Sequence, residues 1–504
     1  MPSQRTRSAS LSKSVAWLYY ESGIASLYRT GRDAWLVILS RTCRMFAFGA
    51  VSLTIALFFS ELGFSDFRIG LFMTLTLLGD VVLGLVVTLM ADGLGRRRVM
   101  FAGGLLMAIS GLVFSVFENF WILLFAAVVG VVSASGGDFG PFRAIEESML
   151  SHITTPKTRA DVLSWYVTSS SLGSAAGTEL AGRYVEALKN RDGWKMLDAY
   201  HATFWIYIVM GALNMIFALS MSGKSEAEKT APEPSDESAQ GLLDESPQGE
   251  EDLDTVNPHH TPVVSAEPKP KSRFSQISSG TRSVMYKLWF LLTVDSLADG
   301  MVSYTLTTYF LHRKFDLSKT ALGDIMSTAF LLGTFSAVFA GPLSRHLGLL
   351  NTMVFTHLPS SAAVLFFPAP KGLVMTMILL YIRMGLNNMD QAPRAAFIAA
   401  VVKPEERTAV MGITSMLRTM GMAIGPSLTG ALAGTDKFWV AYVIGGALRI
   451  MYDLGLWAMF VNMRLHTHET NDQDVGPRGQ SIDGEEPQVG TLELGSIARP
   501  EGTG

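Results

Sequence analysis

The chain has 504 residues, of which 49% are hydrophobic and only 17% are charged, and its formal net charge is -4. Its mean hydropathy of +0.30 excludes an ordinary soluble enzyme, because much of the apolar content lies in runs long enough to cross a bilayer, which takes about 20 residues. The single cysteine excludes a disulfide within the chain and a metal site built on several thiolates. We therefore expect an all-α membrane protein.

Apolar runs predict twelve membrane-spanning helices, six in each half of the chain. In chain order these runs cover residues 35–60, 70–90, 99–117, 121–141, 161–182, 202–221, 285–311, 323–341, 350–367, 372–396, 409–432 and 438–461. The chain then divides into a cytoplasmic N-terminal segment, a six-helix half, an acidic loop, a second six-helix half and a tail. These parts cover residues 1–33, 34–221, 222–284, 285–463 and 464–504. Composition predicts that the loop and the tail are disordered and cytoplasmic.

Basic residues close to the helix ends predict the orientation of the chain in the membrane. Arg29 and Arg32 precede the first helix, and three arginines follow the second helix at 96–98. They place both termini and the acidic loop in the cytoplasm. The loop that follows residue 182 opposes this orientation, since it also carries basic residues: Arg183, Lys189, Arg191 and Lys195.

One stretch of the chain, residues 156–182, recurs 248 positions later. Each copy has a short charged loop followed by an apolar helix with small residues at spacings of four and five. Glycines at such spacings let helices pack closely in lipid, and the repeat predicts two related, pseudo-symmetric halves. The recurring residues are Pro156, Arg159, Gly173, Gly177 and Gly182, which correspond to Pro404, Arg407, Gly421, Gly425 and Gly430.

Between the second and third predicted helices the chain reads Ala91-Asp92-Gly93-Leu94-Gly95-Arg96-Arg97-Arg98. Glycines permit a sharp reversal there, and the arginines favour the cytoplasmic side. The sequence resembles the Asp-Arg-x-Gly-Arg-Arg signature of the major facilitator superfamily, although Thr88 stands at the family's leading glycine and Gly93 at its first basic residue. The resemblance implies twelve helices in two six-helix bundles. It also implies a conformational latch made by Asp92, Gly95, Arg96 and Arg97.

In such a latch, Asp92 would contact the other half in one access state, while the arginines would hold the loop. The equivalent turn of the second half reads Ser344-Arg345-His346-Leu347-Gly348, so a base stands where the first half has an acid.

The predicted helix 161–182 carries a second resemblance. Gly173, Gly177 and Gly182 follow the spacing of the antiporter motif of proton-coupled exporters, with Thr178 in place of the family's proline and Ala181 in place of a glycine. The copy in the second half keeps the proline, as Pro426. The resemblance implies export by proton exchange, and ordinary close packing of helices is the alternative interpretation.

Charged side chains inside the predicted helices cost about 2.5 kcal/mol or more unless they face a cavity or a partner. Opposite charges on the two halves are expected to pair and to exchange partners as the halves rock, whereas permanent ion pairs that only lock the bundle are the alternative. On the last predicted helix, Arg449 and Asp453 are spaced to pair with each other. The candidate substrate pathway consists of Arg41, Arg44, Asp138, Asp295, Asp299, Arg383, Asn387, Asp390 and Arg394, of which the last four share one predicted helix face.

Three carboxylates are candidates for proton coupling, namely Asp80, Asp138 and Glu179. Burial raises the pKa of a carboxyl group and a nearby arginine lowers it, so such a group can titrate near neutral pH. Arg143, Glu146 and Glu147 are expected to form a solvated cluster at a helix end.

The leading functional hypothesis is a secondary transporter that works by alternating access and exports a small organic molecule, drug or toxic anion in exchange for protons. Proton-coupled uptake of a sugar, phosphate or organic acid is one alternative, and a non-transporting receptor or scaffold is another. No nucleophile elbow, HExxH or phosphate-binding loop occurs in the sequence, so we expect no enzyme. We expect a monomer in the plasma membrane, or alternatively the vacuolar membrane. Its expected partners are a small-molecule substrate, protons and lipid, without nucleic acid, cofactor or metal.

Overall fold

The structure is a computed structural model that describes residues 23–132, 142–155, 158–223, 226, 279–402 and 406–461. Every regular element within these residues is a helix. Most of the predicted acidic loop and the whole predicted tail lie outside the described residues.

The first half contains the helices α2 to α9. Their bounds are α2 Ile24–Thr30, α3 Arg32–Glu61, α4 Asp66–Leu94, α5 Arg96–Val116, α6 Phe120–Val129, α7 Phe142–Ile153, α8 Arg159–Lys189 and α9 Met196–Ser220. The single helix predicted over 121–141 is wrong, because α6 ends at Val129 and Val131 has a φ of 51°. A β-branched residue in the left-handed region cannot continue an α-helix.

The second half contains the helices α10 to α18. Their bounds are α10 Ser279–Met301, α11 Tyr304–Phe315, α12 Lys319–Val338, α13 Ala340–Leu347, α14 Leu349–Phe366, α15 Leu373–Asn387, η3 Asn388–Asp390, α16 Gln391–Val401, α17 Arg407–Ala433 and α18 Phe438–Phe460. The continuous helix predicted over 285–311 is wrong, because the chain breaks between α10 and α11, where the Ser303 side chain accepts from the Leu306 N–H. The helix predicted over 372–396 is likewise three pieces, α15, η3 and α16.

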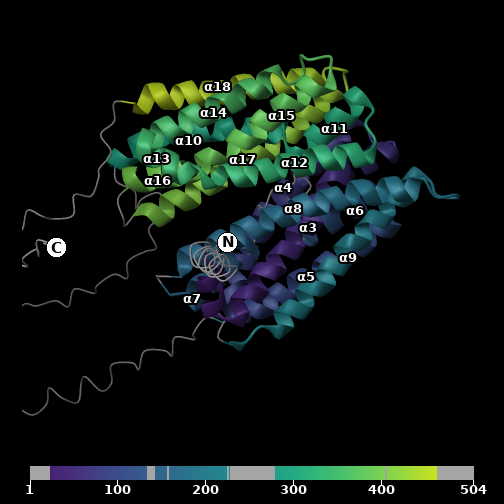
Figure 1. Cartoon of the computed structure of the whole chain (residues 1–504), viewed down its shortest axis with the longest axis horizontal. Helices are drawn as coiled ribbons and strands as arrows, with labels where there is room; N and C mark the ends of the chain where they lie inside the picture. The colour runs from purple at the N-terminus through teal and green to yellow at the C-terminus, as the bar shows by residue number, and fades with distance from the viewer. Residues whose placement is uncertain are drawn as a thin grey trace, which may run out of the picture. The chain divides into compact units, whose positions relative to one another are not determined.

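The two halves share a packing pattern that follows the sequence repeat. α8 packs on α3, and α17 packs on α10. A Cβ added at Gly173 would lie 2.6 Å from the Thr42 carbonyl oxygen, and one at Gly421 would lie 2.8 Å from the Thr293 carbonyl oxygen. Each half therefore forms its own bundle, purple to teal for the first and green to yellow for the second (Figure 1).

Gly177 and Gly425 occupy the next positions along the same two crossings. Gly177 lies against the Phe46 carbonyl of α3, and Gly425 lies against Gly300 of α10. Neither crossing leaves room for a side chain at these positions, so the repeat corresponds to a contact between backbones.

Two further helix pairs join the halves, α4 with α17 and α8 with α12. A Cβ added at Gly430 would lie 3.0 Å from Gly70 Cα, and one added at Gly182 would lie 3.0 Å from Gly323 Cα. The Pro426 carbonyl also lies against Gly70. The two crossings are equivalent under the repeat, and they close one end of the molecule.

Polar contacts reinforce this closed end. Ser427 Oγ lies 2.7 Å from Thr74 Oγ1 across the α4 and α17 pair. Arg313, at the end of α11, lies 2.5 Å from Asp66 at the start of α4. The predicted orientation makes this the non-cytoplasmic end.

Seven of the described helices are long and apolar enough to cross a membrane by themselves: α3, α4, α5, α9, α12, α14 and α18. The other spans carry internal charges or consist of two pieces, which lowers their apolar length. Large apolar side chains such as Trp121, Phe125 and Val374 are exposed on the outer faces, as a lipid environment requires. The result is a twelve-helix membrane protein with two pseudo-symmetric six-helix bundles.

Candidate functional site

A cavity of about 470 Å³ lies between the two halves. From the first half it is lined by Arg143 and Glu147 of α7, and from the second half by α16 and by the first part of α17. α7 and α16 lie at the same end of their bundles (Figure 1), whereas the closed contacts use the last part of α17. The cavity is thus on the predicted cytoplasmic side of the closed end, which corresponds to an inward-facing state.

Three arginines line this cavity, and they differ in their partners. Arg143 donates to Glu147 at 2.8 Å in an exposed pair within α7. Arg394 forms a close ion pair with Asp390. Arg418 donates to Ser296 Oγ at 3.3 Å, and no carboxylate in the described part of the chain lies within 4.0 Å of its guanidinium group.

The rest of the cavity wall is partly apolar, with Ile398, Met411 and Met422 among its lining residues. An apolar wall beside a guanidinium group that has no described carboxylate within 4.0 Å suits a molecule that has both an apolar body and an anionic group.

Behind the cavity, the second half contains a buried charge network. Asp295 of α10 has no exposed side-chain area and lies 3.6 Å from Arg394. Arg449 of α18 pairs closely with Asp299 of α10 and with the Asn387 amide oxygen of α15. The network therefore links α10 with three other helices, α15, α16 and α18.

His357 of α14 lies at the centre of this network. Its Nε2 is 2.7 Å from the Arg449 guanidinium, and its Nδ1 is 2.7 Å from Asp453 Oδ1. The direct pair predicted between Arg449 and Asp453 is wrong, because the imidazole lies between them. Sequence spacing gave no sign of this, since His357 comes from a different helix.

The shared face predicted for the charged residues of 372–396 stays a prediction, because these residues contact different parts of the second half. Arg394 lines the cavity, but Arg383 donates to the Val302 carbonyl and, at 3.0 Å, to Thr307 Oγ1. It thus satisfies one backbone carbonyl and one side-chain hydroxyl at the break between α10 and α11. The 3₁₀ turn η3, Asn388–Asp390, lies between Arg383 and Arg394.

In the first half, the buried arginines have a partner that the sequence analysis missed. Glu146 of α7 has no exposed side-chain area and accepts from Arg44 at 2.6 Å and from the Tyr166 hydroxyl at 2.9 Å. Arg41 donates to the same Tyr166 hydroxyl at 2.7 Å and lies 3.7 Å from Glu146. The solvated cluster predicted for Glu146 is wrong, although Arg143 and Glu147 are exposed. In this state Arg41 and Arg44 both form ion pairs with Glu146, within their own half.

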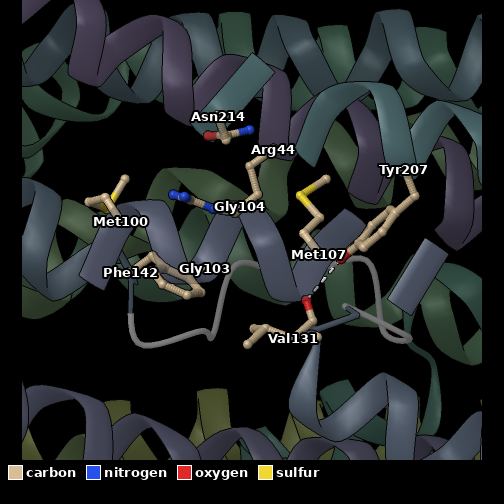
Figure 2. Close-up of a pocket in the computed structure, with 10 residues that line it drawn as sticks. Arg44, Met100, Gly103, Gly104, Met107, Val131, Phe142, Tyr207 and Asn214 are labelled. Atoms are coloured by element: carbon tan, nitrogen blue, oxygen red, sulfur yellow. Dashed lines mark hydrogen bonds between the residues drawn. The ribbon is translucent and has the colours of Figure 1, made fainter. Parts of the chain in front are cut away.

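Arg44 also lines a very small cavity of about 10 Å³ within the first half, together with Met100, Phe142 and Asn214. Figure 2 shows Arg44 pointing toward this space, and the Tyr207 hydroxyl donating to the Val131 carbonyl at its edge. The volume is about that of one water molecule, so this cavity is not a substrate site.

The three predicted proton sites have different environments. Asp80 is buried in α4, with 4% of its area exposed. Glu179 of α8 accepts from Ser327 of α12 at 2.9 Å and from Arg183 at 2.5 Å, so it belongs to the closed end and not to the cavity. Asp138 lies outside the described residues.

At the predicted latch, Gly95 has a φ of +94° between α4 and α5, a conformation that favours glycine. The Arg96 and Arg97 backbone N–H groups donate to the Glu226 carboxylate at 2.7 and 3.2 Å. The Asp92 backbone is part of α4, but its side chain lies outside the described structure, so its predicted contact with the other half stays a prediction.

Two related six-helix bundles that close at one end over a cavity define a membrane transporter. The chain matches the family model described as Major Facilitator Superfamily over residues 37–283 and 288–495, and it belongs to this superfamily. The predicted family and twelve-helix fold are confirmed, and the protein is a multi-pass transporter, not an enzyme.

The chain is 31% identical over 437 residues to the "Uncharacterized membrane protein YJR124C" of Saccharomyces cerevisiae, which covers 86% of this chain and 95% of that relative. Among solved structures, the nucleoside transporter NupG is 13% identical with a TM-score of 0.62, over 85% of this chain and 99% of its own. The human organic anion transporter MFSD10 is 15% identical with a TM-score of 0.52, over 84% and 98%. At such identities these structures share the fold alone.

Proposed function

We propose that this protein is a proton-coupled transporter of small organic anions. The observation that carries the proposal is Arg418, whose guanidinium lines the cavity between the halves without a described carboxylate partner. A cation in such a place costs free energy unless an anion arrives. A volume of about 470 Å³ suits a small organic molecule.

Arg394 supports the same substrate class. It reaches the cavity, while Asp390 and Asp295 compete for its charge. An anionic substrate would share this guanidinium with the two carboxylates. A neutral substrate could accept hydrogen bonds from the two arginines but would not compensate their charge, and a cationic substrate would be repelled by them.

Export by proton exchange remains a proposal that rests on the spacing of Gly173, Gly177 and Gly182. Their close backbone contacts account for the same glycines in either direction of transport. Co-transport of protons with an anion is the second candidate, favoured by the shared position of Arg394, because protonation near Asp295 would release positive charge for the substrate. The plasma membrane and a monomeric state are also proposed, with the vacuolar membrane as alternative.

The substrate class is tested with purified protein in proteoliposomes. Uptake is measured for radiolabelled benzenesulfonate, succinate and phosphate, and for the neutral probes uridine and glucose. We expect uptake of one or more anions and not of the neutral probes. Arg418→Gln should reduce anion uptake about 10- to 100-fold, because a charged hydrogen bond is worth about 1.5–3 kcal/mol. Arg418→Lys should retain part of it.

Arg143→Gln is the matched control, because Arg143 lines the same cavity but is exposed and already paired with Glu147. Its uptake should stay within about threefold of the wild type, as for other exposed ion pairs. The proposed substrate class would be overturned if uridine or glucose were taken up faster than every anion and if Arg418→Gln left this uptake unchanged. Anion accumulation in cells with and without the protein then distinguishes export from uptake.

A further inference from the structure

The hydrogen bonds of His357 define its charge state in this conformation. A guanidinium group can only donate, so Nε2, which lies 2.7 Å from Arg449, must accept. Nδ1 then carries the proton and donates to Asp453 at 2.7 Å. His357 is therefore neutral in the inward-facing state, and this tautomer is assigned from its partners.

Charged and titratable groups surround His357 on every side from which helices pack. α10 contributes Asp295, whose Oδ1 is 3.7 Å from Nε2, and α18 contributes Arg449, Asp453 and the Tyr452 ring, 5.6 Å away between centroids. The segment formed by α15, η3 and α16 contributes three further charged residues. Arg383 donates to the Val302 carbonyl at the break between α10 and α11. Asp390 pairs with Arg394, which lies 3.6 Å from Asp295.

Asp295 is the unusual member of this group. Its side chain is fully buried, and neither carboxylate oxygen accepts a hydrogen bond from any described residue. The nearest nitrogen atoms of Arg394 and His357 lie 3.6 and 3.7 Å from its carboxylate oxygens. A buried carboxylate without donors is costly, and a second N–H on His357 would supply one.

The charges of the network balance while His357 is neutral. The carboxylates are Asp295, Asp299, Asp390 and Asp453, and the guanidinium groups are Arg383, Arg394, Arg418 and Arg449. A proton on His357 gives this buried group one excess positive charge. An anion in the cavity, next to Arg394 and Arg418, would compensate it.

We propose that His357 is a proton-binding residue that couples proton uptake to anion binding in the cavity. In the proposed step, a hydronium ion that passes from the cavity to the buried imidazole gives its proton to Nε2 and leaves as water. One N–H bond forms at Nε2, while the Nδ1–H group keeps donating to Asp453. Nε2 can then no longer accept from Arg449, and it turns from that guanidinium toward Asp295. Arg449 keeps Asp299 and Asn387 as partners.

The consequence is co-transport, because proton and anion each favour the binding of the other. This inference rests on the proposed anion transport. It assigns proton coupling to His357 instead of Asp80, Asp138 and Glu179, the carboxylates expected from the sequence. Histidine suits the task, because its unperturbed pKa lies in the physiological range.

The test uses wild-type and variant protein in proteoliposomes with radiolabelled benzenesulfonate, which stays ionised and cannot carry its own proton through lipid. Two rates are measured, exchange without a gradient and accumulation under an imposed pH gradient. For one proton per anion, the wild type should accumulate the probe about tenfold per pH unit of gradient. His357→Gln should keep exchange and lose at least about ninety per cent of this accumulation. His346→Gln, an exposed histidine of the same half, should behave like the wild type.

A variant that fails to fold would show neither rate, so proton movement is also recorded with the wild type alone. A pH dye inside the vesicles should report one proton entering with each anion. If the wild type exchanges the probe but moves no protons, or if His357→Gln accumulates it as the wild type does, the coupling proposal is overturned while anion transport stands. If the wild type exchanges none of the anionic probes, the proposed function itself fails, and the coupling proposal fails with it.

Discussion

Glu146 holds together the buried polar centre of the first half. Its carboxylate accepts from Arg44 and from Tyr166, which in turn accepts from Arg41. The Arg41 guanidinium also lies over the Tyr166 ring, with its carbon atom Cζ 4.2 Å from the ring centroid. This compact arrangement faces its own bundle and not the cavity, so we interpret it as a structural element.

Glu146→Gln should therefore destabilise the protein more than it changes substrate affinity. Removing one partner of a buried ion pair typically costs about 3–5 kcal/mol, because the remaining charge keeps its desolvation penalty. The measurement is thermal unfolding of the purified protein in detergent, followed by the anion affinity of the folded fraction.

Glu147→Gln provides the control for this prediction. Glu147 is next to Glu146 in the chain, but its ion pair with Arg143 is exposed. The exposed fraction of the side chain is 41% for Glu147 and 49% for Arg143. Such pairs contribute about 0.2–1 kcal/mol, so its unfolding temperature should hardly move. Equal effects of the two substitutions would contradict the structural role of Glu146.

Sequence reasoning at the residue scale located the buried charges but not their partners. Arg44, Asp295 and Arg394 are candidates from the sequence alone, because charge inside an apolar helix is costly wherever the helix lies. Their partners depend on which helices touch and how each is rotated. Glu146 and His357 therefore stay out of the predicted site, since Glu146 follows a helix break and the partners of His357 come from α10 and α18.

At the scale of elements, glycine contacts determine how closely the two halves meet. At the closed end, α8 meets α12 where Gly182 lies against Gly323. In the same way, α17 meets α4 where Gly430 lies against Gly70. A methyl group at either crossing would have to push two helix backbones apart. Under the proposed alternating access the closed end opens during transport, so we expect the same methyl group to cost less in the outward-facing state.

Gly182→Ala and Gly430→Ala should therefore shift the protein toward the outward-facing state. Overpacking of this kind costs about 1–3 kcal/mol, which changes the ratio of the two states roughly 5- to 150-fold. The readout is the rate at which an impermeant maleimide labels Thr74→Cys, at the closed end, in a Cys43→Ser background.

Gly412→Ala is the matched control on the same helix as Gly430. A Cβ at Gly412 would meet nothing within 4 Å in this state, so labelling should stay within about twofold of the background rate. If neither Gly182→Ala nor Gly430→Ala accelerates labelling, the two crossings tolerate a side chain. The packing role of these glycines would then be contradicted.

The helices could be predicted more fully than their interruptions. Hydropathy averages over a span, so the start of α18 at Phe438 was predicted to the residue, and most other ends to within a few residues. The breaks at Val131, at Ser303 and at η3 depend on one to three backbone conformations. Single polar residues inside an apolar run leave the average unchanged, so only the structure shows them.

At the scale of the whole molecule, the halves are alike in packing but different in chemistry. The paired crossings at Gly182 and Gly430 repeat the same geometry. By contrast, the titratable network around His357 belongs to the second half, whereas the corresponding charges of the first half centre on Glu146. We infer that the first half acts mainly as a rigid body, and that the second half carries the charge changes that accompany rocking.

Rocking requires that the closed end open, and this can be tested with a reversible cross-link. The Thr74 and Ser427 hydroxyl groups lie 2.7 Å apart across α4 and α17, close enough for a disulfide between cysteines at these positions. In a Cys43→Ser background, Thr74→Cys with Ser427→Cys should cross-link on oxidation and lose net anion uptake. Because the cavity lies on the other side of this contact, anion binding to the detergent-purified protein should persist within about threefold.

A reducing agent should restore uptake, and each single cysteine variant should be insensitive to oxidation. Only a constraint between the halves predicts this combination of lost transport and retained binding, because general damage to the protein would remove both. Suppose that the fully cross-linked protein takes up anions as fast as the protein treated with the reducing agent. The α4 and α17 contact would then not separate during transport. The rocking mechanism would then have to be replaced by one in which only the α8 and α12 pair opens.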